Sequence, residues 1–182
     1  RPPSSGLSLR GRTVPALIAI EGPIGVGKTT LARKIAETFE YDLLLEEAEM
    51  NPFLERFYQN REQTALATQL FFLFQRVQKI TDIKQRDMFE RTRVTDFILE
   101  KDPLFARVNL EPAEYALYDK VYEKMHVEAP TPDLVIYLQA NPERLLERIG
   151  KRGIDAEQSI TRSYLEQLNE VYSEFFLYYD AA

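Results

Sequence analysis

A glycine-rich turn, Gly22-Pro-Ile-Gly-Val-Gly-Lys-Thr29, holds the residues of this sequence whose types and spacing best suit chemistry. It fits GxxxxGK[ST] at every fixed position, with an apolar run before it and a helical pattern after it. Glycines let successive N–H groups point at phosphate oxygens, and the following helix adds its positive end. Lys28 supplies charge to the β- and γ-phosphates, and Thr29 offers a hydroxyl to Mg²⁺. The residues predicted to bind the triphosphate are Gly22, Pro23, Ile24, Gly25, Val26, Gly27, Lys28, Thr29 and Thr30.

Two further groups of charged residues could complete a phosphoryl-transfer site. Glu46 and Glu47 follow the second apolar run, and open parallel sheets bind ligands at the carboxyl ends of their strands. A carboxylate there can take a proton from an attacking hydroxyl; the alternative is a solvated charge pair that opens a helix. Arg148 and Arg152 lie in a charged segment that we expect to be a mobile loop. Arginines on such a loop can close over a transferring phosphoryl group, whereas the alternative is a charged helix end.

Composition excludes several other kinds of site. The 182 residues include no cysteine, which excludes thiol nucleophiles and thiolate metal sites, and His126 is the only histidine. A net charge of −6 argues against binding duplex nucleic acid through the overall field. No apolar run approaches the roughly 18 residues of a membrane span. We therefore expect no nucleic-acid or membrane partner, and a cytoplasmic location.

The hydropathy pattern places the charged residues between alternating strands and helices. Residues 1–15 are predicted to be a flexible arm, with a stub of an organellar transit peptide as the alternative. Apolar runs predict buried strands at 16–20, 41–45 and 134–138, with a weaker strand near Val94. Helical spacing predicts helices at 28–40, 51–84, 102–127 with a break near 109–112, 142–149, and 161 to the end. Asp102 is predicted to cap the third of these helices. The alternation predicts a three-layer α/β/α domain over residues 16–182, with a central parallel sheet.

The glycine-rich turn alone does not separate kinases from other nucleoside triphosphatases. The domain is compact, which leaves no room for oligomeric motor machinery. The sequence also contains no Asn-Lys-x-Asp motif for reading guanine. Both observations favour a small kinase.

With these residues in view, the chain resembles the deoxynucleoside kinase family from about Ile18 to its C-terminus. Ile20-Glu-Gly-Pro-Ile-Gly-Val-Gly-Lys-Thr29 is similar to the phosphate loop of the family. Leu44-Leu-Glu-Glu47 is similar to its second strand, which ends in the catalytic carboxylate, and the register points to Glu47. The resemblance implies a P-loop NTPase fold with an arginine-bearing lid. It also implies transfer of the γ-phosphate from ATP, with Mg²⁺, to the 5′-hydroxyl of a deoxynucleoside.

The same resemblance assigns the contacts to the nucleoside. Tyr58 and Glu157 would hold the sugar 3′-hydroxyl, Gln69 would read the base edge through paired amide bonds, and Arg76 would contact the base again. The presence of Arg76 is similar to the purine and deoxycytidine branch, so deoxyadenosine or deoxyguanosine is the first expectation. The catalytic candidates are Glu47, Lys28, Arg148, Arg152, Asp96, Glu90 and Arg91.

The chain departs from the family pattern at the third strand, where the family carries Glu-Arg. In one register Glu90-Arg91 matches by identity, Asp96 becomes a base reader, and Glu100 falls at the position that stacks on the base. In the other, Asp96 ends the strand near Mg²⁺ and Phe105 takes the stacking position. Stacking needs an aromatic face, so the second register is favoured. The metal candidates are then Thr29, Glu47 and Asp96.

Two other departures bear on function. Ile154 stands where a third lid arginine is expected, and the chain stops before the last strand of the family. A nucleoside-monophosphate kinase is one alternative, which would need a second phosphate-binding arginine set. A non-catalytic nucleotide-binding subunit of the same fold is another. The resemblance also implies a homodimer formed through helices.

Overall fold

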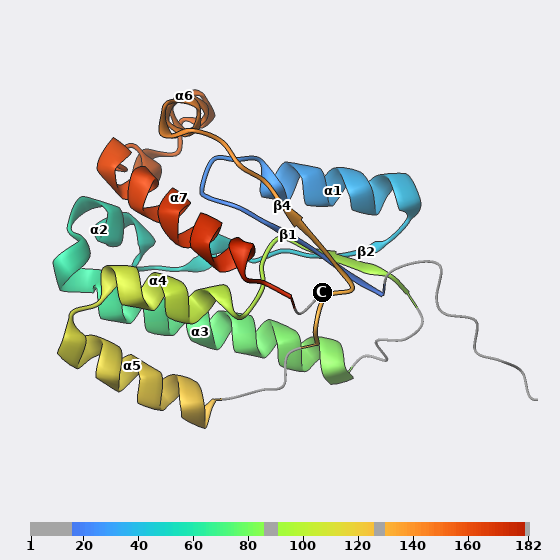
Figure 1. Cartoon of the computed structure of the whole chain (residues 1–182), viewed down its shortest axis with the longest axis horizontal. Helices are drawn as coiled ribbons and strands as arrows, with labels where there is room; N and C mark the ends of the chain where they lie inside the picture. The colour runs from blue at the N-terminus through green and yellow to red at the C-terminus, as the bar shows by residue number, and fades with distance from the viewer. Residues whose placement is uncertain (1–15, 86–90, 126–129, 181–182) are drawn as a thin grey trace, which may run out of the picture.

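A single four-stranded parallel sheet organises the chain (Figure 1). The computed structural model describes residues 16–85, 91–125 and 130–180; the predicted arm at 1–15 lies outside them. The strand order is β2-β3-β1-β4. The strands are β1 (Leu17–Glu21), β2 (Asp42–Leu44), β3 (Arg93–Thr95) and β4 (Leu134–Tyr137). Ala19 and Leu44 both pair with Thr95, so β1, β2 and β3 end at the same edge of the sheet.

Helices cover both faces of the sheet, which confirms the predicted three-layer α/β/α architecture. In Figure 1, α1 lies on one side of the strands, and α3, α4 and α5 lie on the other. The helices are α1 (Lys28–Phe39), α2 (Leu54–Gln59), α3 (Arg61–Gln85), α4 (Lys101–Asn109), α5 (Pro112–Lys124), α6 (Pro142–Arg152) and α7 (Arg162–Leu177). Two short 3₁₀ turns are η1 (Ala48–Met50) and η2 (Asp155–Glu157). No helix in these described segments is long and apolar enough to cross a membrane.

Two apolar clusters hold the layers together. Ile18 and Ile20 point to one face of β1 because side chains alternate along a strand, and there they meet Ala32 and Ala36 of α1. The larger cluster joins the helices on the other side and includes Leu73 of α3. Each large apolar side chain buried in this way contributes about 1.5–3 kcal/mol. The clusters fix the sheet edge at which the loops after β1, β2 and β3 converge.

Helix ends follow local capping rules. At α6, Pro142 occupies the first turn, and Asn141 Oδ1 accepts a hydrogen bond of 2.9 Å from the backbone N–H of Arg144. Thr161 caps α7 in the same way through Tyr164. The C-cap of α6 is Gly153, with a left-handed φ of 67°. Both helices start where the sequence predicts.

Three details differ from the sequence-based expectation. β2 and β4 are edge strands rather than buried ones, and Leu43 and Leu134 are 37% and 43% exposed. α6 continues to Arg152, so Arg148 and Arg152 lie on a helix and not on a loop. α4 begins at Lys101 with Glu100 as its N-cap, so Asp102 does not cap it. The side chain of Asp102 instead has tertiary partners.

Candidate active site

The phosphate loop joins β1 to α1. Gly27 precedes the first residue of α1 with φ 101°, a conformation that favours glycine. Lys28 is folded back over the loop, where its Nζ donates to the carbonyl of Gly22 at 3.0 Å. Burial, and after it the nearby Lys101 ammonium, lowers the pKa of Lys28. The loop therefore presents backbone N–H groups, a helix N-terminus and one ammonium group at the same point.

Asp96 ties the phosphate loop to the end of β2. Its two carboxylate oxygens accept hydrogen bonds from Thr29 Oγ1 at 2.6 Å and from the backbone N–H of Glu46 at 2.7 Å. Asp96 follows β3 directly, so the structure has the second of the two registers. Arg91 is exposed, lies 3.8 Å from Asp42 and is not among the residues that line the cavity described below, so its catalytic role stays a prediction. Glu90 lies outside the described residues.

The Thr29–Asp96 pair fits a magnesium site. Mg²⁺ prefers hard oxygen ligands and keeps several waters, binding through one or two carboxylates together with substrate phosphates. A hydroxyl and a carboxylate beside a phosphate loop are such a set. Within the described residues no group of three or more His, Cys, Asp or Glu could hold a metal. A magnesium ion here would therefore take most of its ligands from phosphate and water.

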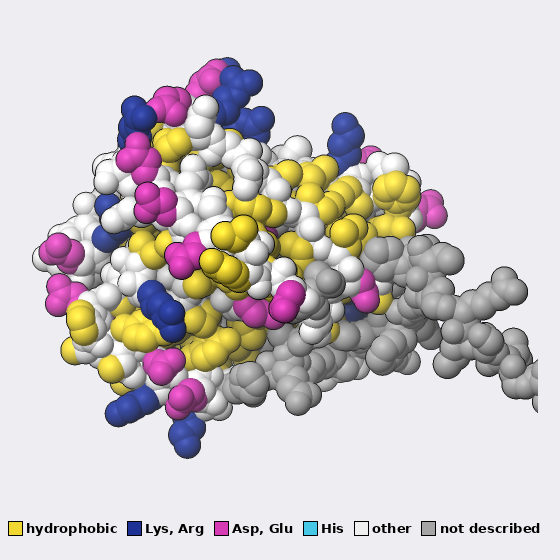
Figure 2. Space-filling model, in the orientation of Figure 1, with side chains coloured by type: hydrophobic (Ala, Val, Ile, Leu, Met, Phe, Trp, Pro, Cys, Tyr) yellow, Lys and Arg dark blue, Asp and Glu magenta, His cyan; other side chains and the backbone are white. Residues whose placement is uncertain are grey.

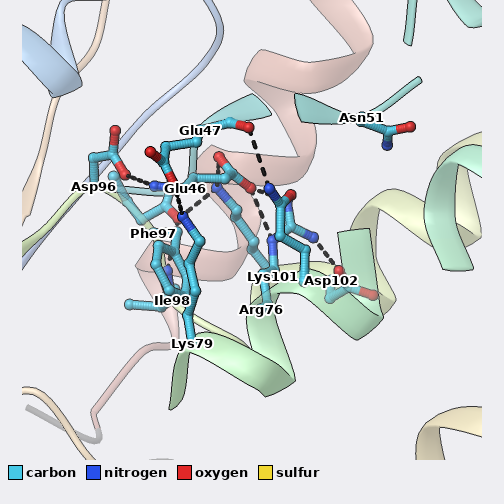
Figure 3. Close-up of polar contacts among 12 residues, drawn as sticks. Glu46, Glu47, Asn51, Arg76, Lys79, Asp96, Phe97, Ile98, Lys101 and Asp102 are labelled. Carbon is cyan, nitrogen blue, oxygen red and sulfur yellow. Dashed lines mark hydrogen bonds and ion pairs between the residues drawn. The ribbon is translucent and has the colours of Figure 1, made fainter. Parts of the chain in front are cut away.

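The two glutamates after β2 occupy different environments. Glu46 is 7% exposed, and its carboxylate binds Arg76, with Nε at 2.8 Å, and Lys101, with Nζ at 3.3 Å. Glu47 has a left-handed φ of 56°, its side chain is 54% exposed, and it pairs with Lys79. Both residues border the same cavity, but only Glu46 has a carboxylate held by buried cations (Figure 3).

The charge of Glu46 is stabilised by its neighbours. Burial alone would favour the neutral acid, but Arg76 and then Lys101 outweigh it and hold the pKa of the carboxyl well below its usual range. Arg76 also binds Asp102, which in turn accepts a hydrogen bond from Tyr118 Oη. Glu46, Arg76, Lys101 and Asp102 thus form one buried network (Figure 3).

A cavity of about 780 Å³ opens from the phosphate loop toward α3 and α4. That volume is within the usual range for small-molecule sites. The cavity is lined by all the residues predicted to contact a nucleoside: Glu47, Tyr58, Gln69, Arg76, Asp96, Phe105 and Glu157. Residues more than a hundred positions apart in the sequence are thus brought to one space.

Individual side chains in the cavity offer polar and aromatic groups to a ligand. Gln69 is 3% exposed, and its Oε1 has no hydrogen-bond partner among the described residues. Phe105 lies edge-on to Tyr172, with ring centroids 5.5 Å apart. Burial, and then the proximity of Tyr164 and Glu157, raises the pKa of the Tyr58 hydroxyl well above its ordinary value. Tyr58 therefore keeps its proton and can donate a hydrogen bond.

The arginines of α6 lie on one side of that helix, four residues apart. Arg148 Nη1 donates to the carbonyl of Val26 in the phosphate loop at 2.9 Å. Arg152 Nε donates to Glu157 Oε2 at 3.0 Å and lines the cavity. Ile154 also lines the cavity, at the position expected for a third arginine. The helix therefore carries two guanidinium groups toward the boundary between loop and cavity.

Sequence reasoning missed three charged residues of the site. Glu21 at the end of β1, and Lys101 and Asp102 at the start of α4, are all almost fully buried. For Lys101 and Asp102 the available signal was the charged run Glu100-Lys-Asp102, which begins five residues after the end of β3, near the sheet edge where ligands bind in parallel sheets. The Asp-Pro pair in that run indicated a helix cap more strongly than a buried charge.

These features define a nucleoside triphosphate-dependent phosphotransferase, with a phosphate loop on one side of a buried carboxylate and an acceptor cavity on the other. Comparison with known proteins narrows the class. The deoxynucleoside kinase family model matches residues 18–182. Two relatives from Bacillus subtilis are a deoxyguanosine kinase, 38% identical over 83% of this chain and 73% of that protein, and a deoxyadenosine/deoxycytidine kinase, 31% identical over 91% and 79%.

A solved structure agrees with the sequence relatives. Deoxyadenosine kinase from M. mycoides with bound dATP superposes with a TM-score of 0.78 at 30% identity, covering 89% of this chain and 84% of that one. The chain belongs to the deoxynucleoside kinase family. Its activity is therefore ATP-dependent phosphorylation of deoxynucleosides at the 5′-hydroxyl.

Proposed function

We propose that Glu46, rather than the neighbouring Glu47, accepts the proton of the 5′-hydroxyl in this kinase. The observation that carries the proposal is the buried Glu46 carboxylate, which borders the cavity and is bound by Arg76 and Lys101. A deoxynucleoside in the cavity would place its 5′-oxygen between this carboxylate and the phosphate loop. That oxygen bonds to the γ-phosphorus as the bond to the β-phosphate oxygen breaks, ADP leaves, and the proton passes to Glu46.

The remaining residues would stabilise the phosphoryl group during transfer. Lys28 balances charge on the β- and γ-phosphates, while Arg148 and Arg152 approach from α6. Thr29 and Asp96 would hold Mg²⁺, which when bound neutralises phosphate charge. A carboxylate with a low pKa is suited to this reaction, because the loose transition state needs orientation of the hydroxyl more than early proton removal.

Substitution of each glutamate by glutamine separates the two candidates. Glu46→Gln should lower kcat by about 100-fold or more, since loss of a positioned base costs ~10²–10⁴-fold. Glu47→Gln should cost less than about tenfold, because its side chain is half exposed and paired with Lys79. Steady-state kinetics at saturating ATP measures both. The reverse ranking would return the role to Glu47.

The base preference proposed for this chain is a purine deoxynucleoside. Gln69 offers a donor and an acceptor to a base edge, and Arg76, which binds Asp102, lines the same cavity. The names of the relatives, deoxyguanosine kinase and deoxyadenosine/deoxycytidine kinase, agree with this branch. Product formation from the four deoxynucleosides, run beside dAMP and dTMP as acceptors, tests the preference and the monophosphate-kinase alternative together.

We also propose that the protein is a homodimer and that it is cytoplasmic. Hydrophobic side chains gather over α4 and α5 on the face shown in Figure 2, and Leu117 of α5 is half exposed. Such a face suits a homodimer, which light scattering would detect as twice the chain mass. A cytoplasmic location is the remaining part of the proposal, and fractionation of cells tests it.

A further inference from the structure

Lys101 is a buried cation that takes no part in the proton transfer or the phosphoryl transfer proposed above. It is 2% exposed at the first residue of α4. Its Nζ lies 3.0 Å from Glu21 Oε1 and 3.3 Å from Glu46 Oε2. The two carboxylates come from the ends of different strands, β1 and β2. One ammonium group therefore bridges the strand that leads into the phosphate loop and the carboxylate that faces the acceptor.

A lysine is not the residue that stability alone would favour at this position. A cation at the N-terminus of a helix opposes the helix dipole, and burial of an ammonium group costs several kcal/mol before any partner is counted. Lys101 also lies near the Lys28 ammonium, and two like charges repel one another. Three unfavourable effects at one side chain indicate a role in the site.

The other end of the bridge is held firmly. Glu21 is fully buried and accepts hydrogen bonds from the backbone N–H groups of Gly22 at 3.1 Å and Ile98 at 3.0 Å. It also accepts one from Tyr172 Oη at 3.2 Å. With Glu21 fixed by these contacts, Lys101 has a defined position from which to hold Glu46. Asp96 is followed by a buried phenylalanine, Phe97, so no guanidinium group follows the strand-end acid.

We propose that Lys101, anchored by Glu21, is a positioning residue for phosphoryl transfer that acts by orienting the Glu46 carboxylate toward the acceptor hydroxyl. The inference rests on the proposed role of Glu46. It predicts a specific kinetic pattern, because a misplaced carboxylate affects turnover while the phosphate loop and the base contacts stay intact.

Lys101→Met should lower kcat by about 100-fold, with the KM for the deoxynucleoside and the Kd for ATP changed by less than about threefold. Lys101→Arg keeps the charge and should restore kcat to within about tenfold of the parent protein. Lys34→Met, at an exposed lysine of α1, is the matched control. Normal kcat in Lys101→Met, or no rescue by arginine, would overturn the proposal.

A double-mutant cycle tests whether Lys101 acts through Glu46. In a Glu46→Gln background, Lys101→Met should cost less than about threefold, since the carboxylate that it orients is gone. Two independent, multiplicative losses would overturn the proposal. The single variant Glu46→Gln tests the proposed role of Glu46 as the proton acceptor. A failure of that role is therefore distinguished from a failure of the positioning role of Lys101.

Removal of Lys101 leaves Glu21 buried without its cation, which could unfold the protein. Glu21→Gln/Lys101→Met removes both charges and keeps an amide at position 21. If Lys101 only neutralises Glu21, this double variant regains the kcat of Glu21→Gln, and the proposal fails. If it orients Glu46, kcat stays low in a protein with a normal melting transition. A double variant that does not fold would assign the pair to folding and equally overturn the proposal.

Discussion

At the scale of single residues, Gln69 is the proposed reader of the base edge, and its burial has a cost to the fold. Its side chain is buried on α3, and its Oε1 has no partner in the described structure. A buried polar atom without a partner costs about 1–3 kcal/mol. The base edge of a bound deoxynucleoside can remove that cost, so Gln69 should contribute to affinity more than to stability.

Gln69→Leu should separate these two contributions. We expect the KM for purine deoxynucleosides to rise about tenfold or more while kcat stays within about threefold, because a base contact is lost and the reacting atoms are not touched. The free energy of unfolding should stay the same or rise by up to about 1 kcal/mol, because an unsatisfied buried atom is removed.

Steady-state kinetics and urea unfolding check the two halves of this prediction. Gln63→Leu, the same change at an exposed position of α3, is the control. A large loss of stability in Gln69→Leu with an unchanged KM would mean that the amide serves the fold and not the base.

At the scale of elements, α6 determines where the two arginines lie. The helix runs through Gly150 and ends at Arg152, and its C-cap is Gly153, whose φ of 67° allows the chain to turn. The sequence predicted an end near residue 149 because a glycine followed it. One glycine inside a helix costs only about 1 kcal/mol, and the capped start and the apolar contacts of Leu145 and Ile149 outweigh it.

The same substitution at these two glycines should have opposite effects. Gly150 has helical backbone and open space where a Cβ would lie, so Gly150→Ala should stabilise the protein by about 0.5–1 kcal/mol. Gly153 also has open space, but its positive φ strains any L side chain, so Gly153→Ala should destabilise by about 1 kcal/mol.

Thermal unfolding measures the change in stability of each variant, and steady-state kinetics measures its kcat. If α6 stays helical during turnover, Gly150→Ala keeps normal kcat. A lowered kcat in that stabilised variant would show that the helix must unwind around Arg148 and Arg152 to close the site.

The helices and strands could be predicted from the sequence more readily than their positions relative to one another. Strands such as β1 and β4 and the start of α6 follow from apolar runs and capping residues, which act locally. The edge position of β2 could not be read locally, because strand order depends on which strands pair. The same limit explains why Leu43 was predicted to be buried.

The phosphate loop was predictable for the same reason, since its chemistry lies in consecutive residues. The choice between Glu46 and Glu47 was not, because it depends on a left-handed φ of 56° at Glu47. Lys101 could be found only once α4 was placed against β1 and β2. Residue types indicated the chemistry of the site, and tertiary packing determined which of the two glutamates is buried beside Arg76 and Lys101.

At the scale of the whole molecule, the domain folds around a set of buried charges. Four carboxylates and three cations meet near the carboxyl ends of β1, β2 and β3: Glu21, Glu46, Asp96, Asp102, Lys28, Arg76 and Lys101. Each ion loses its hydration, so the network stabilises the fold only while the charges remain paired. Protonation of one member therefore affects the stability of the entire domain.

The sign of this effect follows from Glu46. Its folded-state pKa lies well below the ordinary value of 4.5, because Arg76 and Lys101 outweigh burial. Below about pH 4.5 the unfolded chain therefore binds more protons than the folded protein. The stability that Glu46 contributes is fully present above that pH and is lost progressively as the pH falls, with a slope of up to about 1.4 kcal/mol per pH unit.

Glu46→Gln should make the acid side of the stability curve shallower by up to that slope, even though the variant is less stable than the parent at neutral pH. Urea unfolding at roughly pH 6, 4.5 and 3.5 measures the difference in slope between the two proteins. Glu62→Gln, at an exposed position of α3, controls for the change in net charge. An unaltered acid slope in Glu46→Gln would mean that this carboxyl titrates as it does in solvent. That result would contradict both the buried ion network and the positioning of Glu46 by Lys101, because an ammonium group that orients a carboxylate must also hold it ionised.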